Sequence, residues 1–158
     1  MRLVNVPRGL TLIELMIGMV ITAILLGMAA PYLGDYITNS RLRENGNSLM
    51  ADALFAQSEA LKRNGVVRLS VTSGAVQILD MAPATPVVIR SRNFTDGISA
   101  TVTTLDFGSD GMTRPRGTEA SIDTTFAGVT CSAEQRCPRV LVEAGGNVRL
   151  CGNKLSCS

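Results

Sequence analysis

The chain has 158 residues, enough for one small domain and an N-terminal segment, and 46% of its residues are hydrophobic whereas only 4% are aromatic. Its formal net charge of +2 predicts no strong electrostatic partner by itself. Histidine, the commonest general base and the commonest zinc ligand, is absent. Because the sequence also shows no catalytic triad, metal cluster or cofactor-binding loop, we expect neither an enzyme nor a bound cofactor or metal.

The first element in chain order is an apolar segment at residues 10–30, in which Glu14 is the only charge. As a helix this segment would be roughly 30 Å long, the thickness of the hydrocarbon core of a bilayer. A carboxylate in such a helix costs about 2.5 to 3.5 kcal/mol on insertion scales. We therefore expect Glu14 to have a partner.

Three interpretations fit this N-terminus. A cleaved secretory signal would have Arg2 and Arg8 as its basic start and residues 27–30 as its cleavage site, but its apolar core would be shorter and would lack Glu14. A plain membrane anchor fits the length and leaves Glu14 and Gly9 unexplained. The third interpretation is a signal for a specialised peptidase, and it explains more of these residues.

Residues 7–16, PRGLTLIELM, resemble the class III signal of type IV prepilins, in which a short basic leader and a glycine precede an apolar residue and Thr-Leu-Ile-Glu-Leu. In that family a prepilin peptidase cuts after the glycine and methylates the new N-terminus. The resemblance implies cleavage between Gly9 and Leu10, N-methylation of Leu10, and docking of Glu14 on the N-terminal amine of a neighbouring subunit. It also places Pro31 where the long helices of pilins often bend.

Beyond Pro31 the apolar period resumes, which predicts that the helix continues as an amphipathic half. The helix should stop at Asn64-Gly65, with glycine supplying the left-handed conformation. Phe55 and Arg43 break the pattern of faces. At 100° per residue the apolar face comprises Leu42, Gly46, Leu49, Met50, Ala53, Leu54, Ala56, Ala60 and Leu61, and the polar face comprises Arg41, Glu44, Asp52, Glu59, Lys62 and Arg63.

From Val66 the hydrophobic period changes to two, which predicts strands. The turns TSG at residues 72–74 and AGG at residues 144–146 indicate hairpins. DFGSDG contains Asp-Phe-Gly, the magnesium-binding triplet of kinases, and it also resembles a calcium-binding loop. The glycine-rich and catalytic loops of a kinase are missing, and so are the acid spacing and closing glutamate of a calcium loop. We therefore expect a strand followed by a turn. The strand candidates are residues 66–71, 75–80, 86–90, 98–107, 139–143 and 147–151.

These elements predict an α+β, type IV pilin-like fold, in which a long bent N-terminal helix packs on a small antiparallel sheet. The membrane half of the helix would be followed by its amphipathic half. The expected division is a prepilin leader at residues 1–9, a transmembrane or filament-core helix at residues 10–33 and a periplasmic head domain at residues 34–158.

The four cysteines, Cys131, Cys137, Cys151 and Cys157, all lie near the C-terminus. Their even number and the preceding membrane segment favour disulfides in an oxidising compartment. Local pairing within each Cys-x5-Cys is weakly preferred because short loops close at modest entropic cost, and long-range pairing of the last strands is the alternative. A zinc site built from all four cysteines is a further alternative. It would need gaps of two to four residues between paired ligands, whereas both gaps here are five residues, which disfavours zinc.

Beyond the leader, the chain resembles the GspH/FimT group of minor pilins and pseudopilins. QSEALKR at residues 57–63 is similar to the helix end of that group, TLDFGSDGMTR to its Phe-x-x-x-Gly turn, and RVLVEAGGNVRLC to its closing hairpin. The resemblance implies a minor subunit of a type IV pilus that contributes to pilus assembly or to a tip complex. A pseudopilin of type II secretion is the alternative, although the cysteine-rich tail favours the pilus.

The resemblance also implies partners and a location. The partners would be other major and minor pilins, the prepilin peptidase and an inner-membrane assembly platform. The protein would cross the bacterial inner membrane once, with its N-terminus in the cytoplasm, and would later be periplasmic or extracellular in the pilus.

DNA binding for natural transformation is a third function. Some FimT-type members bind DNA through a Gly-Arg-x-Arg motif in the C-terminal tail. The corresponding stretch, residues 146–149, keeps Arg149 but has Asn147 in place of the first arginine. Each charge that neutralises a phosphate adds its own counterion release, so we expect weak binding at most, and a solvated face is the alternative. The candidate DNA-binding cations are Arg136, Arg139, Arg149 and Lys154.

Overall fold

A long helix, α1, forms the N-terminal part of the described residues. The computed structural model describes residues 11–157, apart from the side chains of residues 29–32, and α1 runs from Leu12 to Arg63. The chain divides into two compact units, Met1–Tyr36 and Ile37–Ser158, and α1 continues from the first into the second. We call the second unit the head.

The apolar part of α1 exposes its side chains, as Leu12, Leu15 and Leu26 illustrate. Within the described residues, no single helix is both long and apolar enough to cross a membrane, and the segments Leu12–Met28 and Leu33–Arg63 meet that condition only together, as a bent pair. The side chain of Pro31 lies outside the described residues. The span at residues 10–33 and the bend at Pro31 therefore stay predictions.

The helix ends at Asn64-Gly65, as the sequence predicts. The N–H of Gly65 donates to the carbonyl of Ala60 at 3.2 Å, and the N–H of Asn64 donates to the carbonyl of Leu61 at 3.3 Å. These two bonds form a Schellman motif. The expectation that the glycine supplies the left-handed residue is wrong, because it is Asn64 that has a φ of 51°. Asparagine tolerates this conformation through local hydrogen bonding of its short side chain.

Five antiparallel strands form the first sheet of the head, in the order β3-β2-β1-β5-β6. The central strand β1 alternates buried Val67, Leu69 and Val71 with half-buried residues, as its period of two predicts. TSG makes the predicted β1–β2 hairpin, in which the N–H of Thr72 donates to the carbonyl of Ala75 at 2.8 Å. The strands are β1 (Val67–Val71), β2 (Ala75–Asp80), β3 (Val87–Asn93), β5 (Thr103–Phe107) and β6 (Thr113–Arg114).

Four antiparallel strands form the second sheet, in the order β4-β7-β8-β9. AGG makes the predicted β8–β9 hairpin, in which the N–H of Gly146 donates to the carbonyl of Glu143 at 2.8 Å. A short 3-10 helix, η1 (Lys154–Ser156), follows the last strand. The strands are β4 (Ile98–Ala100), β7 (Ala120–Phe126), β8 (Arg139–Val142) and β9 (Val148–Cys151).

The predicted α+β fold, with a long helix packed on antiparallel strands, is confirmed, but the strands form two sheets and not one. Residues 98–107, predicted as one strand, are divided between β4 in the second sheet and β5 in the first, and the N–H of Thr101 between them donates to the carbonyl of Asp123. Strand β7 is not among the predicted strands. Its buried Thr124 looks polar in the sequence, but its hydroxyl donates to the carbonyl of Pro138 at 3.0 Å, which satisfies it inside the fold.

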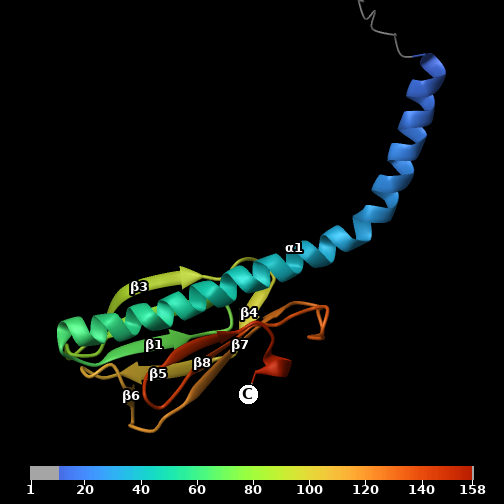
Figure 1. The fold of residues 1–158 in the computed structure, drawn as a ribbon. Helices are drawn as coiled ribbons and strands as arrows, with labels where there is room; N and C mark the ends of the chain where they lie inside the picture. The colour runs from blue at the N-terminus through green and yellow to red at the C-terminus, as the bar shows by residue number, and fades with distance from the viewer. Residues whose placement is uncertain (1–10, 158) are drawn as a thin grey trace, which may run out of the picture. The chain divides into compact units, whose positions relative to one another are not determined.

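In the head, α1 lies along the sheets, and Figure 1 shows its green C-terminal part beside β3 and over β1. The predicted apolar face is largely confirmed, because Leu42, Leu49, Ala53, Ala56 and Ala60 are fully buried. Two of its members are placed wrongly, since Leu54 and Leu61 are exposed.

The predicted polar face of α1 also needs correction, because Asp52 and Glu59 are buried. Asp52 accepts from Arg92 of β3 at 2.7 Å, and Glu59 accepts from Arg63 at 2.8 Å. Buried carboxylates need such partners, and the partner of Asp52 lies 40 residues away in the chain. Phe55 breaks the predicted pattern of faces because it lies among polar residues. Its ring is covered by the guanidinium of Arg90, which lies 5.3 Å from the ring centre.

One side chain of α1 joins the helix to turns of both sheets. The amide of Gln57 donates to the carbonyl of Gly111 in the β5–β6 turn at 2.7 Å and to the carbonyl of Gly146 in the β8–β9 turn at 2.8 Å. The hydroxyl of Thr113 donates to the carbonyl of Ala144 at 3.0 Å, between the same two turns. These bonds fix the second sheet to the first.

Candidate functional site

Thr11 and Glu14 form a reciprocal pair of contacts at the start of α1. Oε2 of Glu14 accepts from the N–H and from the hydroxyl of Thr11, each at 2.9 Å, and the hydroxyl of Thr11 accepts from the N–H of Glu14 at 3.4 Å. This is a capping box, which satisfies donors that a helix N-terminus leaves without an intrahelical partner. The Thr-x-x-Glu spacing in the sequence could have indicated it.

The capping box leaves Glu14 able to accept more hydrogen bonds. A carboxylate has about four acceptor sites, so it can keep Thr11 and also receive an ammonium group. Leu12, Ile13 and Leu15 beside it are more than half exposed within the described part of the chain, which gives a partner an apolar surface. The predicted cleavage residues Gly9 and Leu10 lie outside the described residues.

The four cysteines form two local disulfides in the structure. Cys131 is bonded to Cys137 and Cys151 to Cys157, and each pair has a Cα–Cα distance of 5.6 Å. The long-range pairing is therefore not the one in the structure. The zinc alternative is wrong here, because no cysteine is left as a free thiol. Within residues 11–157, no group of three histidine, cysteine or acidic residues could hold a metal ion.

The two disulfide loops are hydrogen-bonded to each other and to α1. The amide of Asn153 donates to the carbonyl of Ser132 at 2.6 Å, and the N–H of Lys154 donates to the carbonyl of Cys137 at 2.7 Å. Asn39 of α1 donates to the carbonyl of Glu134 at 2.9 Å and accepts from the N–H of Arg136 at 3.0 Å. The sequence gives no local signal for the role of Asn39.

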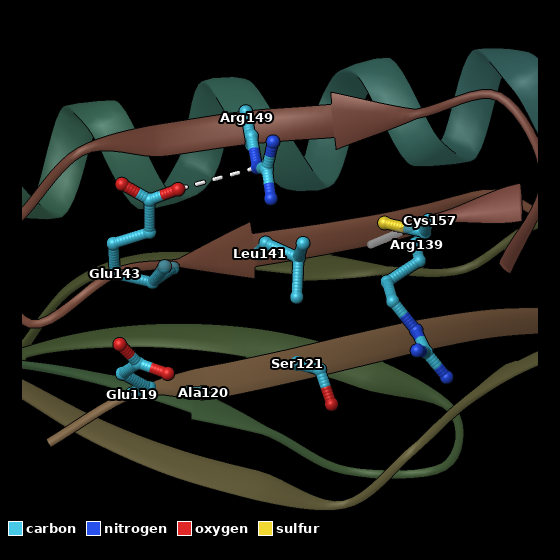
Figure 2. A pocket seen from close by; sticks show the side chains of 9 residues that line it. Glu119, Ala120, Ser121, Arg139, Leu141, Glu143, Arg149 and Cys157 are labelled. Atoms are coloured by element: carbon cyan, nitrogen blue, oxygen red, sulfur yellow. Dashed lines mark ion pairs between the residues drawn. The ribbon is translucent and has the colours of Figure 1, made fainter.

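The second sheet carries a hollow of about 460 Å³ on the face that points away from α1 (Figure 2). Ser121, Leu141 and Arg149 are register neighbours on β7, β8 and β9, so their side chains point to the same side. Leu141 is the apolar centre of the hollow in Figure 2. The lining residues are Glu119, Ala120, Ser121, Arg139, Leu141, Val142, Glu143, Arg149 and Cys157.

Three of the four predicted DNA-binding cations lie on or beside this sheet, and each is close to a carboxylate. Arg139 donates through two nitrogens to Asp123, at 2.5 and 2.9 Å, and these bonds lower the pKa of the Asp123 carboxyl. Lys154 Nζ lies 3.9 Å from the same carboxylate. Arg149 Nε lies 3.3 Å from Oε1 of Glu143, which is the ion pair drawn in Figure 2.

The fourth predicted cation, Arg136, lies apart from the hollow, on the Cys131–Cys137 loop. Its Nε donates to the carbonyl of Ala133 at 3.5 Å. Asn147, which replaces the first arginine of the DNA-binding pattern, donates to Oε2 of Glu143 at 3.2 Å. Positions 147 and 149 thus converge on one carboxylate, and an incoming phosphate would have to compete with it. This arrangement weakens the case for DNA binding.

Family models match two parts of the chain. Residues 5–30 match the prokaryotic N-terminal methylation motif, and residues 45–146 match the type II transport protein GspH. The chain belongs to the GspH family. The first match covers the predicted cleavage site and Glu14, and the second covers the amphipathic part of α1 and the sheets as far as the β8–β9 turn.

The fold of this GspH-family protein is that of a type IV minor pilin. It is similar to two crystal structures of the minor pilin FimU from Pseudomonas aeruginosa strain PAO1, with TM-scores of 0.56 and 0.60. These matches cover 68% and 73% of this chain and 90% and 91% of the FimU chains, at 17% sequence identity. At that identity the similarity concerns the fold alone. No curated protein sequence matched significantly.

Proposed function

We propose that this GspH-family protein is a minor subunit of a type IV pilus and contributes to pilus assembly or to a tip complex. The observation that carries the proposal is the presence, on one chain, of a methylation motif at residues 5–30 and a head with the fold of FimU. The proposed division of the chain is a leader at residues 1–9, a membrane and filament-core helix at residues 10–33 and a periplasmic head at residues 34–158.

In this proposal, processing creates the partner of Glu14. A cut between Gly9 and Leu10 by the prepilin peptidase leaves an ammonium group on Leu10, which is then methylated. A carboxylate in apolar surroundings is stabilised strongly by an ammonium at hydrogen-bonding distance. Before assembly, hydrogen bonds from Thr11 satisfy part of the acceptor capacity of the Glu14 carboxylate. On assembly Glu14 accepts a hydrogen bond from the N-terminal amine of a neighbouring pilin, and this contact fixes the axial position of the subunit.

Mass spectrometry of the N-terminus tests the processing step. The mature chain is expected to begin at methylated Leu10, and Gly9→Glu is expected to leave the leader attached. A mature chain beginning near Ala30 would instead establish an ordinary secretory signal and would remove the basis of the proposal.

Recruitment to pili tests the docking role of Glu14. Glu14→Ala is expected to insert into the membrane at least as well as the natural chain, because a charge that is costly in the bilayer is gone. It should co-purify poorly with pili, because the neighbouring amine loses its partner. Glu44→Ala removes an exposed carboxylate from the head part of α1 and is the matched control. Equal recruitment of the two variants would contradict the docking role.

A second candidate function is that of a pseudopilin in type II secretion, with the same processing in a different machine. It is supported by the description of the matched family model, which is a type II transport protein. Affinity purification of the tagged protein with its neighbours distinguishes the two. Co-purification of pilins and a pilus assembly platform favours the pilus, and co-purification of secretion components favours the pseudopilin.

A further inference from the structure

Ion pairs neutralise most of the positively charged side chains of the head. In each pair a carboxylate oxygen lies between 2.5 and 3.9 Å from a nitrogen of the lysine or arginine. The cations paired in this way are Lys62, Arg63, Arg68, Arg90, Arg92, Arg114, Arg116, Arg139, Arg149 and Lys154. Within the part of the chain that the structure describes, the cations without a carboxylate partner are Arg41, Arg43 and Arg136. We call these three the unpaired arginines.

The fold brings the unpaired arginines to one end of the head. Arg41 and Arg43 are exposed on α1, close to residue 37, where the head begins. Arg136 belongs to the Cys131–Cys137 loop, and its N–H donates to the side chain of Asn39 at 3.0 Å. Asn39 lies two residues before Arg41 and one turn before Arg43, so all three arginines are attached within about 6 Å of the length of α1.

The acids nearest to these arginines form no ion pair with them. Glu134 lies in the same loop as Arg136, but its carboxylate accepts from the hydroxyl of Ser132 at 2.9 Å. Glu44 is exposed on α1 beside Arg43 and has no ion pair within the described residues. A guanidinium presents five N–H donors in a planar fork that matches the oxygens of a phosphate group. This end of the head can therefore bind a ligand that offers several phosphates.

We propose that the unpaired arginines bind the phosphate groups of anionic phospholipids in the periplasmic leaflet before the subunit is assembled. The inference rests on the proposed function, which places a membrane helix at residues 10–33. Arg41 lies eight residues beyond that helix, a distance of about 12 Å along α1. The headgroup layer extends about 5 to 8 Å beyond the hydrocarbon core.

The direction of helical side chains closes the remaining few ångströms. In an α-helix each side chain leans toward the N-terminus of the helix, which in the proposed topology is the direction of the membrane. Long arginine side chains extend in this way to place the charged group at the headgroups. The contact would hold the head on the membrane surface until the subunit is extracted into the filament.

Native mass spectrometry of the full chain in detergent tests the proposal. Phosphatidylglycerol and phosphatidylcholine with the same acyl chains are added separately, so that binding by the apolar helix contributes equally to both. The natural chain is expected to prefer phosphatidylglycerol by roughly tenfold or more, because each cation at an anionic surface contributes about fivefold. Replacing all three unpaired arginines by glutamine should bring the preference close to one. An equal preference in the natural chain and this triple variant overturns the proposal.

A matched control separates the unpaired arginines from a general effect of charge. Lys62→Gln with Arg116→Gln removes two exposed cations that are ion-paired elsewhere in the head. It changes the net charge by the same amount as Arg41→Gln with Arg136→Gln. The control should keep the preference for phosphatidylglycerol, and the second pair should lose most of it. An equal loss in both pairs overturns the proposal.

Competition identifies the source of the phosphate. Neither inorganic phosphate nor duplex DNA, each at the concentration of the lipid, should displace phosphatidylglycerol, and displacement by either one overturns the proposal. Failure of the proposed function is visible separately in the mass of the chain. A mature chain that begins near Ala30 would lack the membrane helix, so the function and the inference would fail together. A chain that begins at methylated Leu10 and shows no preference for phosphatidylglycerol overturns the inference alone.

Discussion

The side-chain amide of Gln57 and the backbone carbonyl of Gly146 are 2.8 Å apart, and this bond holds the closing hairpin of the second sheet against α1. This contact requires a glycine at position 146. Gly146 has a φ of 82°, and a Cβ at this position would overlap the carbonyl oxygen of Gly111. A residue with a side chain would therefore meet both backbone strain and a steric clash at the contact between the two sheets.

Gly146→Ala is expected to lower the free energy of unfolding by about 2 to 3 kcal/mol, because an unfavourable φ alone costs roughly 1 to 3 kcal/mol. Thermal unfolding of the full chain in detergent, followed by circular dichroism, measures the change. Gly145→Ala is the control, because no heavy atom lies within 4 Å of the Cβ it would add. Equal unfolding temperatures for the two variants would contradict the packing described for this turn.

Acid is expected to remove a stabilising contribution from Asp110. Hydrogen bonds, first from Arg114 and then from the N–H of Met112, lower the pKa of Asp110 to about 2, from an ordinary value near 3.9. Because the folded-state pKa is the lower one, the contribution is present above about pH 4 and is lost as the pH falls toward 2. The natural chain should lose stability over that interval.

The same reasoning predicts how Asp110→Asn behaves. The variant should be less stable than the natural chain at pH 5, and the difference in unfolding temperature should shrink toward zero near pH 2. Asp96→Asn, which removes an exposed carboxylate from the β3–β4 loop, controls for the change in surface charge. A difference between Asp110→Asn and the natural chain that stays constant from pH 5 to pH 2 would argue against the assigned contacts.

Each disulfide is expected to stabilise the head by about 2 kcal/mol, the chain-entropy value for a loop this short. Replacing Cys151 and Cys157 together by serine should lower the unfolding temperature, and replacing Cys131 and Cys137 together should do so to a similar extent. Peptide mapping without reductant should recover the two local pairs. Four free thiols in material from the periplasm would refute both local and long-range pairing.

DNA binding by the tail should be weak, non-specific and strongly reduced by salt. Arg149→Ala should remove most of it, and Asn147→Arg should strengthen it. Because Glu143 contacts both positions, Asn147→Arg combined with Glu143→Gln should bind more tightly than Asn147→Arg alone. A mobility-shift titration at low salt measures these differences. If the combined variant gains nothing and the natural chain is silent, the tail face has no role in DNA binding.

The sequence predicts those parts of the fold that rest on local signals. The helix end at Asn64-Gly65 and the turns at TSG and AGG carry their own turn chemistry, and the structure contains all three. Strand β7 was not predicted because it alternates polar residues with Ile122 and Thr124, and only the fold shows that Thr124 is buried. The division into two sheets depends on pairing between distant strands, which no local pattern specifies.

Among the candidate site residues too, some follow from a local motif and others depend on contacts between distant parts of the chain. Gly9, Leu10 and Glu14 follow from one contiguous motif, so the sequence is sufficient to predict their roles. The burial of Asp52 depends on Arg92, and the neutralisation of Arg139 depends on a strand that the sequence did not reveal. The burial of Asp52 and Glu59 could not be predicted from the helix pattern, because a helical projection places both acids on the polar side of α1.

Asn39 sets an order of events for the folding chain. Its two hydrogen bonds join residues that are 95 and 97 positions apart in the sequence. These contacts can form only once Glu134 and Arg136 have been added to the chain, and contacts of such separation are among the slowest to form. Until then the surface of α1 at Gly46, against which Pro138 packs in the folded head, stays exposed.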